Sequence, residues 1–221
     1  MLRDAHPAIQ GVISEASSIH ILGAGLKPER PAHQAVHDLQ DRGWRLVPVH
    51  PNDAGGAILG RPVRASIEDG VQPEVVVFFL APERAKQAVM EMIVKFDQRT
   101  MPLLWFQPGS EHEGVLEMLN EAGMLHIVDD CIVRFIQRHH LTSQHKAAPS
   151  PWCLQIASDD GSGCSVWTVE SASDSKNPPA TALEWCGDFV DLQRSNHTVA
   201  RYVRSLAEPG ETIEALAHRL A

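Results

Sequence analysis

Short runs of apolar residues alternate, along the first part of the chain, with longer segments in which apolar residues recur every three or four positions. Near-continuous apolar runs are typical of strands buried on both faces of a sheet, and the longer period is that of amphipathic helices. Such alternation predicts an α/β fold, in which a parallel sheet is wrapped by helices. The expected strands are 18–23, 45–49, 74–79, 102–106 and 124–128, and the expected helices are 6–16, 31–42, 82–96, 111–122 and 131–139.

The chain changes character after residue 141. Residues 142–151 are polar and contain two prolines, which favours a linker. Two strands are expected at 152–156 and 164–169, joined by a hairpin turn at 159–163. Residues 182–192 fit either a strand or a helix, and two helices should follow at 197–207, capped by Asn196, and at 211–220. We therefore predict one domain over 1–141, a linker over 142–151 and a small α+β domain of unknown role over 152–221.

The most informative segment follows the first expected strand, where the small residues Gly23, Ala24 and Gly25 precede Lys27 and Arg30. Glycine lets a ligand approach the backbone closely. The first turn of the following helix offers unpaired N–H groups and the positive end of a dipole. This glycine loop, residues 23–30, therefore predicts a site for a phosphate-bearing nucleotide. The alternative, a tight turn between strand and helix without a ligand, stays open here.

A dinucleotide such as NAD or FAD is disfavoured on two counts. The dinucleotide fingerprint needs a third glycine, and Pro28 stands at that position. It also needs an acidic residue at the end of the second strand, for the ribose. The strand at 45–49 is followed by His50 and Pro51, and the nearest carboxylate, Asp53, comes only after that proline.

Charge and composition narrow the function classes. The chain has 221 residues and a formal net charge of −9, which argues against a broad nucleic-acid interface. No apolar stretch approaches the length of a membrane span, and the acidic Asp4 and Glu15 do not fit a signal peptide. Cys131, Cys153, Cys164 and Cys186 form no CxxC pair, so we expect free thiols in a cytoplasmic protein.

Five sequence blocks together resemble a known family. They are residues 23–31, 43–51, 77–83, 104–109, and 121–123 with 128–132. Each block falls at the end of an expected strand, where open parallel sheets bind ligands. In this order the blocks resemble the bacterial CoA-binding family, which shares its Rossmann-like fold with the CoA-binding domain of the succinyl-CoA synthetase alpha chain. Residues beyond about 145 are not part of the resemblance.

The resemblance implies coenzyme A or an acyl-CoA as ligand. The glycine loop would hold the pyrophosphate, with Lys27 and Arg30 on the pyrophosphate or the ribose 3′-phosphate. The end of the second strand would line the adenosine, the turn after the third strand would contact the adenine or the pantetheine arm, and Gln107 would bond the pantetheine amides. The expected ligand-binding residues are Gly23, Ala24, Gly25, Leu26, Lys27, Arg30, Val49, His50, Pro51, Leu80, Ala81, Pro82, Gln107, Gly109 and Cys131.

The chain departs from the family pattern at several polar positions. The family usually has serine at Gly25, serine and tyrosine at Ala32 and His33, and often asparagine at His50. It often has arginine at the two further positions, which are Leu80 and Asp130 here. Two of the changes lose a positive group, and one of these also introduces an acid.

Three roles remain open at this point. The first is a CoA-binding protein without chemistry of its own, because no nucleophile, base or metal set is recognisable. The second is an enzyme that acts on an acyl-CoA, with the C-terminal domain completing the site. The third is a regulatory or assembly module, in which that domain contacts a second copy or another protein. Catalytic residues are not identifiable, and no metal site is expected, since His139, His140 and His145 lack a carboxylate or thiol at ligand spacing.

Overall fold

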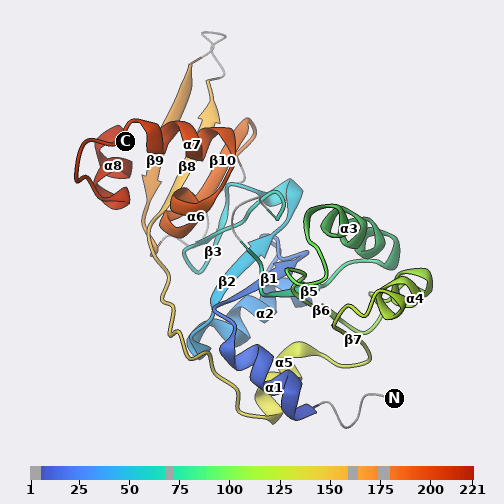
Figure 1. Ribbon diagram of the computed structural model, residues 1–221. Coiled ribbons are helices and arrows are strands. Elements are labelled where there is room, and N and C mark those ends of the chain that lie inside the picture. Colours follow the sequence, from blue (N-terminus) through green and yellow to red (C-terminus); the bar gives the residue numbers. More distant parts are fainter. Residues whose placement is uncertain (1–5, 68–71, 159–163, 174–179) are drawn as a thin grey trace. The chain divides into compact units, whose positions relative to one another are not determined.

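The computed structural model describes residues 6–67, 72–158, 164–173 and 180–221 (Figure 1). The chain forms two compact units, each built from separate stretches of sequence. Unit 1 comprises Met1–Gly23, Gln34–Leu46 and Pro73–Ala148, and unit 2 comprises Ala24–His33, Val47–Gln72 and Pro149–Ala221. The division into domains 1–141 and 152–221 remains a prediction.

The main sheet has five strands in the order β2-β1-β5-β6-β7. The registers are parallel, with Ile19 opposite Val75, Val75 opposite Leu103, and Leu104 opposite His126. This confirms the predicted Rossmann-like α/β fold. The strands are β1 (Ser18–Leu22), β2 (Arg45–Val49), β5 (Val75–Phe78), β6 (Leu103–Phe106) and β7 (His126–Ile127). The last is shorter than expected because it pairs only with Leu104 and Trp105 of its neighbour.

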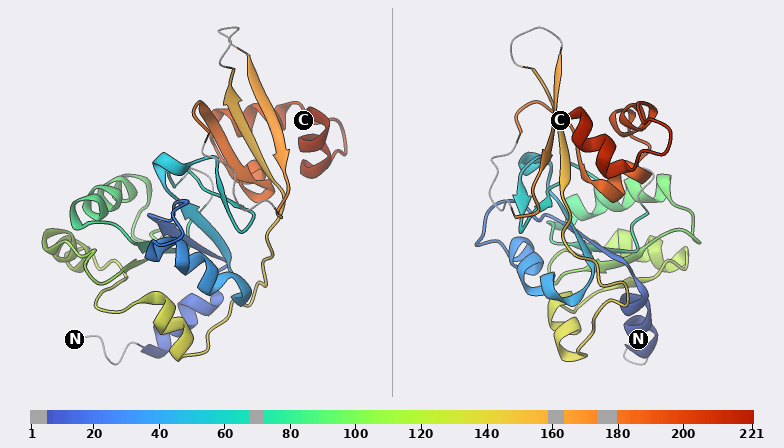
Figure 2. Two further views of the ribbon diagram at one scale, coloured as in Figure 1. Left: turned by 180° about the vertical axis from the view of Figure 1, so that it is seen from behind. Right: turned by 90° about the vertical axis from the view of Figure 1, so that its left-hand side faces the viewer.

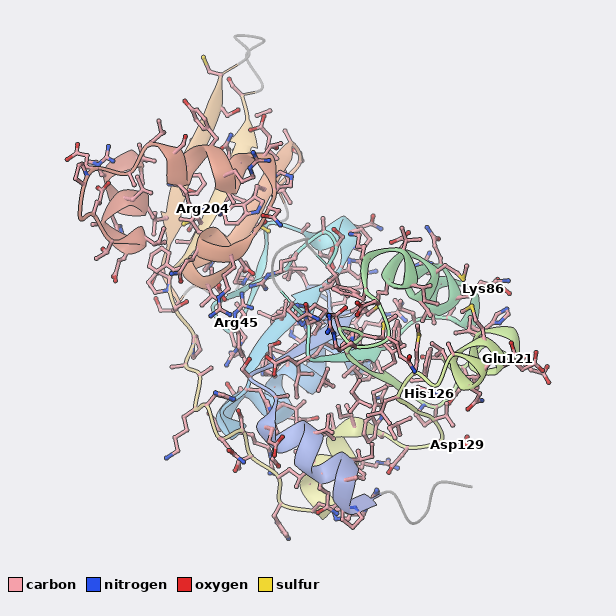
Figure 3. All side chains as sticks on the ribbon, viewed as in Figure 1. Arg45, Lys86, Glu121, His126, Asp129 and Arg204 are labelled. Carbon is pink, nitrogen blue, oxygen red and sulfur yellow. The ribbon has the colours of Figure 1, made fainter. Side chains whose placement is uncertain are left out.

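The helices of this fold lie close to their predicted ranges. Pro82 opens α3 because its missing N–H would have no partner in a first helical turn. The second helix ends in a short 3-10 turn before Gly43, whose φ of 89° is left-handed. Lys86 on α3 and Glu121 on α4 lie on the exposed sides of their helices (Figure 3). The helices are α1 (His6–Glu15), α2 (Pro31–Leu39), α3 (Pro82–Lys95), α4 (Glu113–Glu121) and α5 (Ile132–Arg138).

Aromatic residues fill the core of unit 1. The rings of Phe78 and Phe106, on adjacent strands, stack with centroids 4.7 Å apart. Trp105 meets Phe135 edge to face at 5.0 Å, and its indole N–H donates to the Asp130 carbonyl. All four rings are buried. The aromatic pair at 105–106 is therefore part of the core, as expected from the sequence.

The C-terminal part of unit 2 is a three-stranded antiparallel sheet in the order β10-β8-β9. Helices α6, α7 and α8 cover one face of it, as the edge-on view in Figure 2 shows. The Trp167 and Trp185 rings stack 6.0 Å apart in the core between the sheet and these helices. The elements are β8 (Trp152–Ala157), β9 (Ser165–Glu170), β10 (Leu183–Asp188), α6 (Phe189–Arg194), α7 (Thr198–Ser205) and α8 (Ile213–Leu220).

The structure resolves two local questions in this part of the chain. Residues 182–192 are both a strand and a helix, because Asp188 ends β10 and caps α6 by accepting from the amides of Val190 and Asp191. The expected cap of α7 at Asn196 is wrong, since His197 is the N-cap and accepts from the Val199 amide. The hairpin turn expected at 159–163 lies outside the described residues.

The segment after β2 belongs to the same unit as the C-terminal sheet. It forms a small hairpin of β3 (Ala57–Ile58) and β4 (Arg61–Pro62). Ala57 packs with Trp152 and Cys186 in a buried cluster, and the Cys186 thiol donates to the Val63 carbonyl at 3.3 Å. Residues 57–63 and the C-terminal strands therefore share a core.

A buried ion-pair cluster links the segment after β2 to the start of α6. Arg64, only 4% exposed, donates from Nε to Asp191 at 2.9 Å and lies 3.4 Å from Asp188. A second guanidinium nitrogen donates to the Pro62 carbonyl at 2.9 Å. Burial, with help from the two nearby carboxylates, raises the pKa of the Cys153 thiol to about 12. This thiol is therefore inert at neutral pH.

Candidate functional site

The glycine loop begins where β1 ends. Gly23 has a φ of +96°, and a Cβ there would lie 2.5 Å from the Phe79 carbonyl oxygen. Both the backbone conformation and this close approach require glycine. The Phe79 amide in turn donates to the Leu22 carbonyl at 3.0 Å, which ties the end of β1 to the residue after β5.

Two of the loop amides are available to a ligand. Ala24 is fully buried and Gly25 is buried, yet no described residue accepts a hydrogen bond from either backbone N–H. Buried N–H groups without a protein acceptor are rare, and where they occur they commonly bond water or a ligand. These two groups fit the predicted phosphate site.

The third amide of the loop is not available. The Leu26 N–H donates to the Asp53 carboxylate at 2.8 Å. The same carboxylate oxygen lies 3.3 Å from the His50 imidazole. Leu26 is one of the expected ligand-binding residues, and in this structure a protein carboxylate accepts the hydrogen bond from its N–H.

The loop carries positive charge on its exposed side. Lys27 and Arg30 are both exposed, and the Arg30 amide donates to the Lys27 carbonyl at 3.1 Å, which closes a turn. Within the described residues, neither side chain has an ion-pair partner. Both cations can thus reach an anionic ligand without breaking an internal contact.

His33, in the first turn of α2, contacts the loop through a hydrogen bond. Its Nδ1 donates to the Gly25 carbonyl at 2.8 Å, and the ring is only 8% exposed. From the sequence, His33 stood out only as a departure from the family pattern. Its role in holding the loop carbonyl had no sequence signal beyond its position near the start of a helix.

The end of β2 lies in unit 2 with the loop. Val49 is buried and bridges to Arg64, whose carbonyl accepts from the His50 amide at 2.9 Å. Pro51 starts a 3-10 turn, Pro51–Asp53, that brings the Asp53 carboxylate back to the loop. The expectation that no carboxylate lies at this strand end is therefore wrong: Asp53 is distant in the sequence from the loop but contacts it in the folded chain. Pro28, at the position of the third glycine, still disfavours a dinucleotide.

In unit 1, the other predicted residues follow β5 and β6. Leu80 is half-buried, while Ala81, the N-cap of α3, and Pro82 are exposed. The Gln107 amide donates to the Phe78 carbonyl at 3.2 Å, which sets the two strand ends side by side. The Gln107 side chain is 94% buried (6% exposed), and its Nε2 has no hydrogen-bond partner. An unsatisfied buried amide of this kind is a candidate donor to a ligand carbonyl.

Gly109 lies in a turn before the following helix. It has a φ of +89°, and its amide donates to the Glu111 carboxylate at 2.6 Å. Helix α4 begins only at Glu113, with His112 as its N-cap. Gly109 thus supports a turn, and its N–H is already used within the chain.

Cys131 is the half-buried N-cap residue of α5, and its side chain makes no capping hydrogen bond. The neighbouring Asp130 forms an ion pair with Arg138, at 3.3 Å for the longer of two contacts. The negative charge introduced at Asp130 is therefore balanced within the chain. No reactive role for Cys131 follows from this arrangement.

The histidines near the linker have structural contacts. His139 packs on Phe135 and lies 3.2 Å from the Gln10 amide, and His145 contacts the Glu15 carbonyl at 2.9 Å. His126 is buried, with its Nδ1 2.9 Å from the Met124 carbonyl. In the part of the chain that the structure describes, no group of three or more His, Cys, Asp or Glu side chains could hold a metal ion. No helix among these residues is long and apolar enough to cross a membrane.

The sheet and its helices define a Rossmann-like domain with a glycine-containing turn after its first strand. Residues 17–136 match the family model described as the CoA binding domain. The chain therefore belongs to the CoA-binding domain family. The match ends before the C-terminal strands of unit 2.

The chain also resembles individual known proteins. The chain is similar to the uncharacterized protein YneT of Bacillus subtilis (strain 168), with 27% identity over 124 residues, 56% of this chain and 88% of YneT. Among solved structures it resembles cell-free ID.343 from Thermus thermophilus, with 29% identity, a TM-score of 0.54, and coverage of 60% of this chain and 97% of the other. It also resembles a hypothetical protein from Pyrococcus horikoshii OT3, with 27% identity, a TM-score of 0.53, and coverage of 60% and 90%.

Proposed function

We propose that the protein binds coenzyme A or an acyl-CoA, with the glycine loop holding the diphosphate. The observation that carries this proposal is the pair of loop amides, Ala24 and Gly25, that have no acceptor among the described residues. Oriented backbone N–H groups next to a helix start form a site for phosphate oxygens. Lys27 and Arg30 add the positive charge that a diphosphate or a ribose 3′-phosphate needs, against a chain whose net charge is −9.

The remaining contacts are assigned by the resemblance to the family. Val49, His50 and Pro51 would line the adenosine. The turn of Leu80, Ala81 and Pro82 would pack on the adenine or the pantetheine arm. The buried, unpaired Nε2 of Gln107 supports a role as donor to a pantetheine carbonyl. Gly109 and Cys131 complete the proposed set, although the Gly109 amide already bonds Glu111.

We further propose a binding role without chemistry. The polar groups gathered at the loop do not form a nucleophile with its base. The His50 ring lies against Asp53, and the His33 ring is committed to the Gly25 carbonyl. Imidazoles placed in this way position the loop. Among the described residues, neither of them activates a hydroxyl or thiol. The C-terminal strands and helices would stabilise the segment after β2.

Calorimetric titration of the full chain tests the proposal. We expect saturable binding of CoA, and weaker binding of dephospho-CoA, because the latter lacks the 3′-phosphate that a cation would contact. The loss of one charge-assisted hydrogen bond corresponds to roughly 10-fold or more in Kd. Absence of CoA binding at millimolar concentration would refute the proposal, and equal affinity for both compounds would refute the cation's role.

A further inference from the structure

One oxygen of Asp53 makes two contacts at the glycine loop. Oδ2 accepts the Leu26 N–H at 2.8 Å and lies 3.3 Å from the His50 Nδ1. The Asp53 side chain is 20% exposed, so solvent screens this contact only in part. A carboxylate oxygen is therefore held where a loop amide points, with the same charge and hydrogen-bonding character as a phosphate oxygen.

The absence of a side chain at residue 25 is what admits this carboxylate. A Cβ on Gly25 would lie 2.1 Å from Asp53 Oδ2 and 3.0 Å from the His50 Cγ. The first separation requires the Asp53 carboxylate to move if residue 25 carries a side chain, and the second requires a small shift of the His50 ring. No left-handed φ calls for glycine at this position, so the close approach of Asp53 is the reason for it. Gly25 and Asp53 form a matched pair.

We propose that Asp53 is an internal competitor of the ligand: it occupies the Leu26 amide in the free protein and must leave when a diphosphate binds. The inference rests on the function proposed above and specifies how that site is regulated. A diphosphate held by the adjacent Ala24 and Gly25 amides would lie next to this carboxylate, and two anions at contact distance repel each other. Asp53 therefore lowers the affinity of the loop for phosphates.

Four variants of the full chain test this inference by calorimetry with CoA and with inorganic pyrophosphate. Asp53→Ala removes the competitor, and Asp53→Asn keeps its size without its charge. Gly25→Ala places a methyl group where the Asp53 carboxylate lies and so displaces it. Asp38→Asn, at an exposed position on α2, removes one negative charge away from the loop as the matched control. Thermal unfolding identifies any variant that fails to fold.

We expect Asp53→Ala to bind both probes at least about 10-fold more tightly than the natural chain, the gain when a charge-assisted bond within the protein no longer competes. Asp53→Asn and Gly25→Ala should also gain affinity, and Asp38→Asn should stay within about 2-fold of the natural chain. Weaker binding by Asp53→Ala would mean that Asp53 contacts the ligand directly and would overturn the inference, as would unchanged binding. If Asp53→Ala does not fold, the result for Gly25→Ala decides in the same way.

The two proposals fail differently. If no variant binds CoA, the proposed function falls, and the pyrophosphate arm still decides the role of Asp53. A gain in pyrophosphate affinity on removing the carboxylate supports the competitor. No gain overturns it.

Discussion

Replacement of Arg64 by Ala is expected to destabilise unit 2 by about 3–5 kcal/mol, the usual cost of removing one partner from a buried ion pair. Arg64 is 4% exposed and donates to Asp191 and to the Pro62 carbonyl. Its loss would remove the Arg64 guanidinium from Asp188 and Asp191, which are 8% and 4% exposed. Each carboxylate also accepts a hydrogen bond from a backbone amide, and these bonds would offset only part of the cost.

Urea unfolding followed by tryptophan fluorescence measures the effect, since Trp152 and Trp185 are buried in unit 2. Arg138→Ala is the matched control, because it breaks an Arg–Asp pair in which the arginine side chain is 50% exposed. Exposed pairs contribute about 0–1 kcal/mol. If both variants lose the same small amount of stability, the buried cluster does not hold the segment after β2 in place.

Replacement of Lys27 or Arg30 by Ala is expected to weaken CoA binding by about 1.5–3 kcal/mol each, roughly 10- to 150-fold in Kd. Both side chains are exposed and lack an ion-pair partner among the described residues, so each substitution should leave the stability of the chain unchanged. Their charge acts against a net charge of −9. The losses should shrink at high salt, because screening weakens exposed charges.

Calorimetry at low and high salt measures this effect, with Lys86→Ala as the control. Lys86 is an exposed cation on α3, outside the predicted ligand-binding set (Figure 3). A change in Kd that is the same for Lys27→Ala and Lys86→Ala would show that only net charge matters. Unchanged affinity in both loop variants would remove these cations from the site.

The parallel sheet could be predicted because its signals are local. The run Val75–Phe78 is apolar throughout, and the strand lies in the interior of the sheet with every residue buried. The junction of β10 and α6 could not be assigned by periodicity, since strand and helix follow one another without a loop. The acidic pair Asp188 and Asp191 was the available signal, because such spacing is typical of a helix cap.

The role of Asp53 depended on contacts between distant positions. Asp53 and Leu26 are 27 positions apart, and only the turn that begins at Pro51 brings the carboxylate to the loop. The contacts of residues 57–63 with the C-terminal strands could not be predicted from the sequence either. The apolar Ala57 and Val63 in a segment rich in glycine and proline were a signal of burial, although they could not identify the partner.

A crystal structure of the full chain with CoA tests the central claim most directly. We predict that diphosphate oxygens lie within hydrogen-bonding distance of the Ala24 and Gly25 amides, with the Asp53 carboxylate moved off the Leu26 N–H. A diphosphate bound elsewhere, while the Leu26–Asp53 hydrogen bond remains intact, would contradict the account.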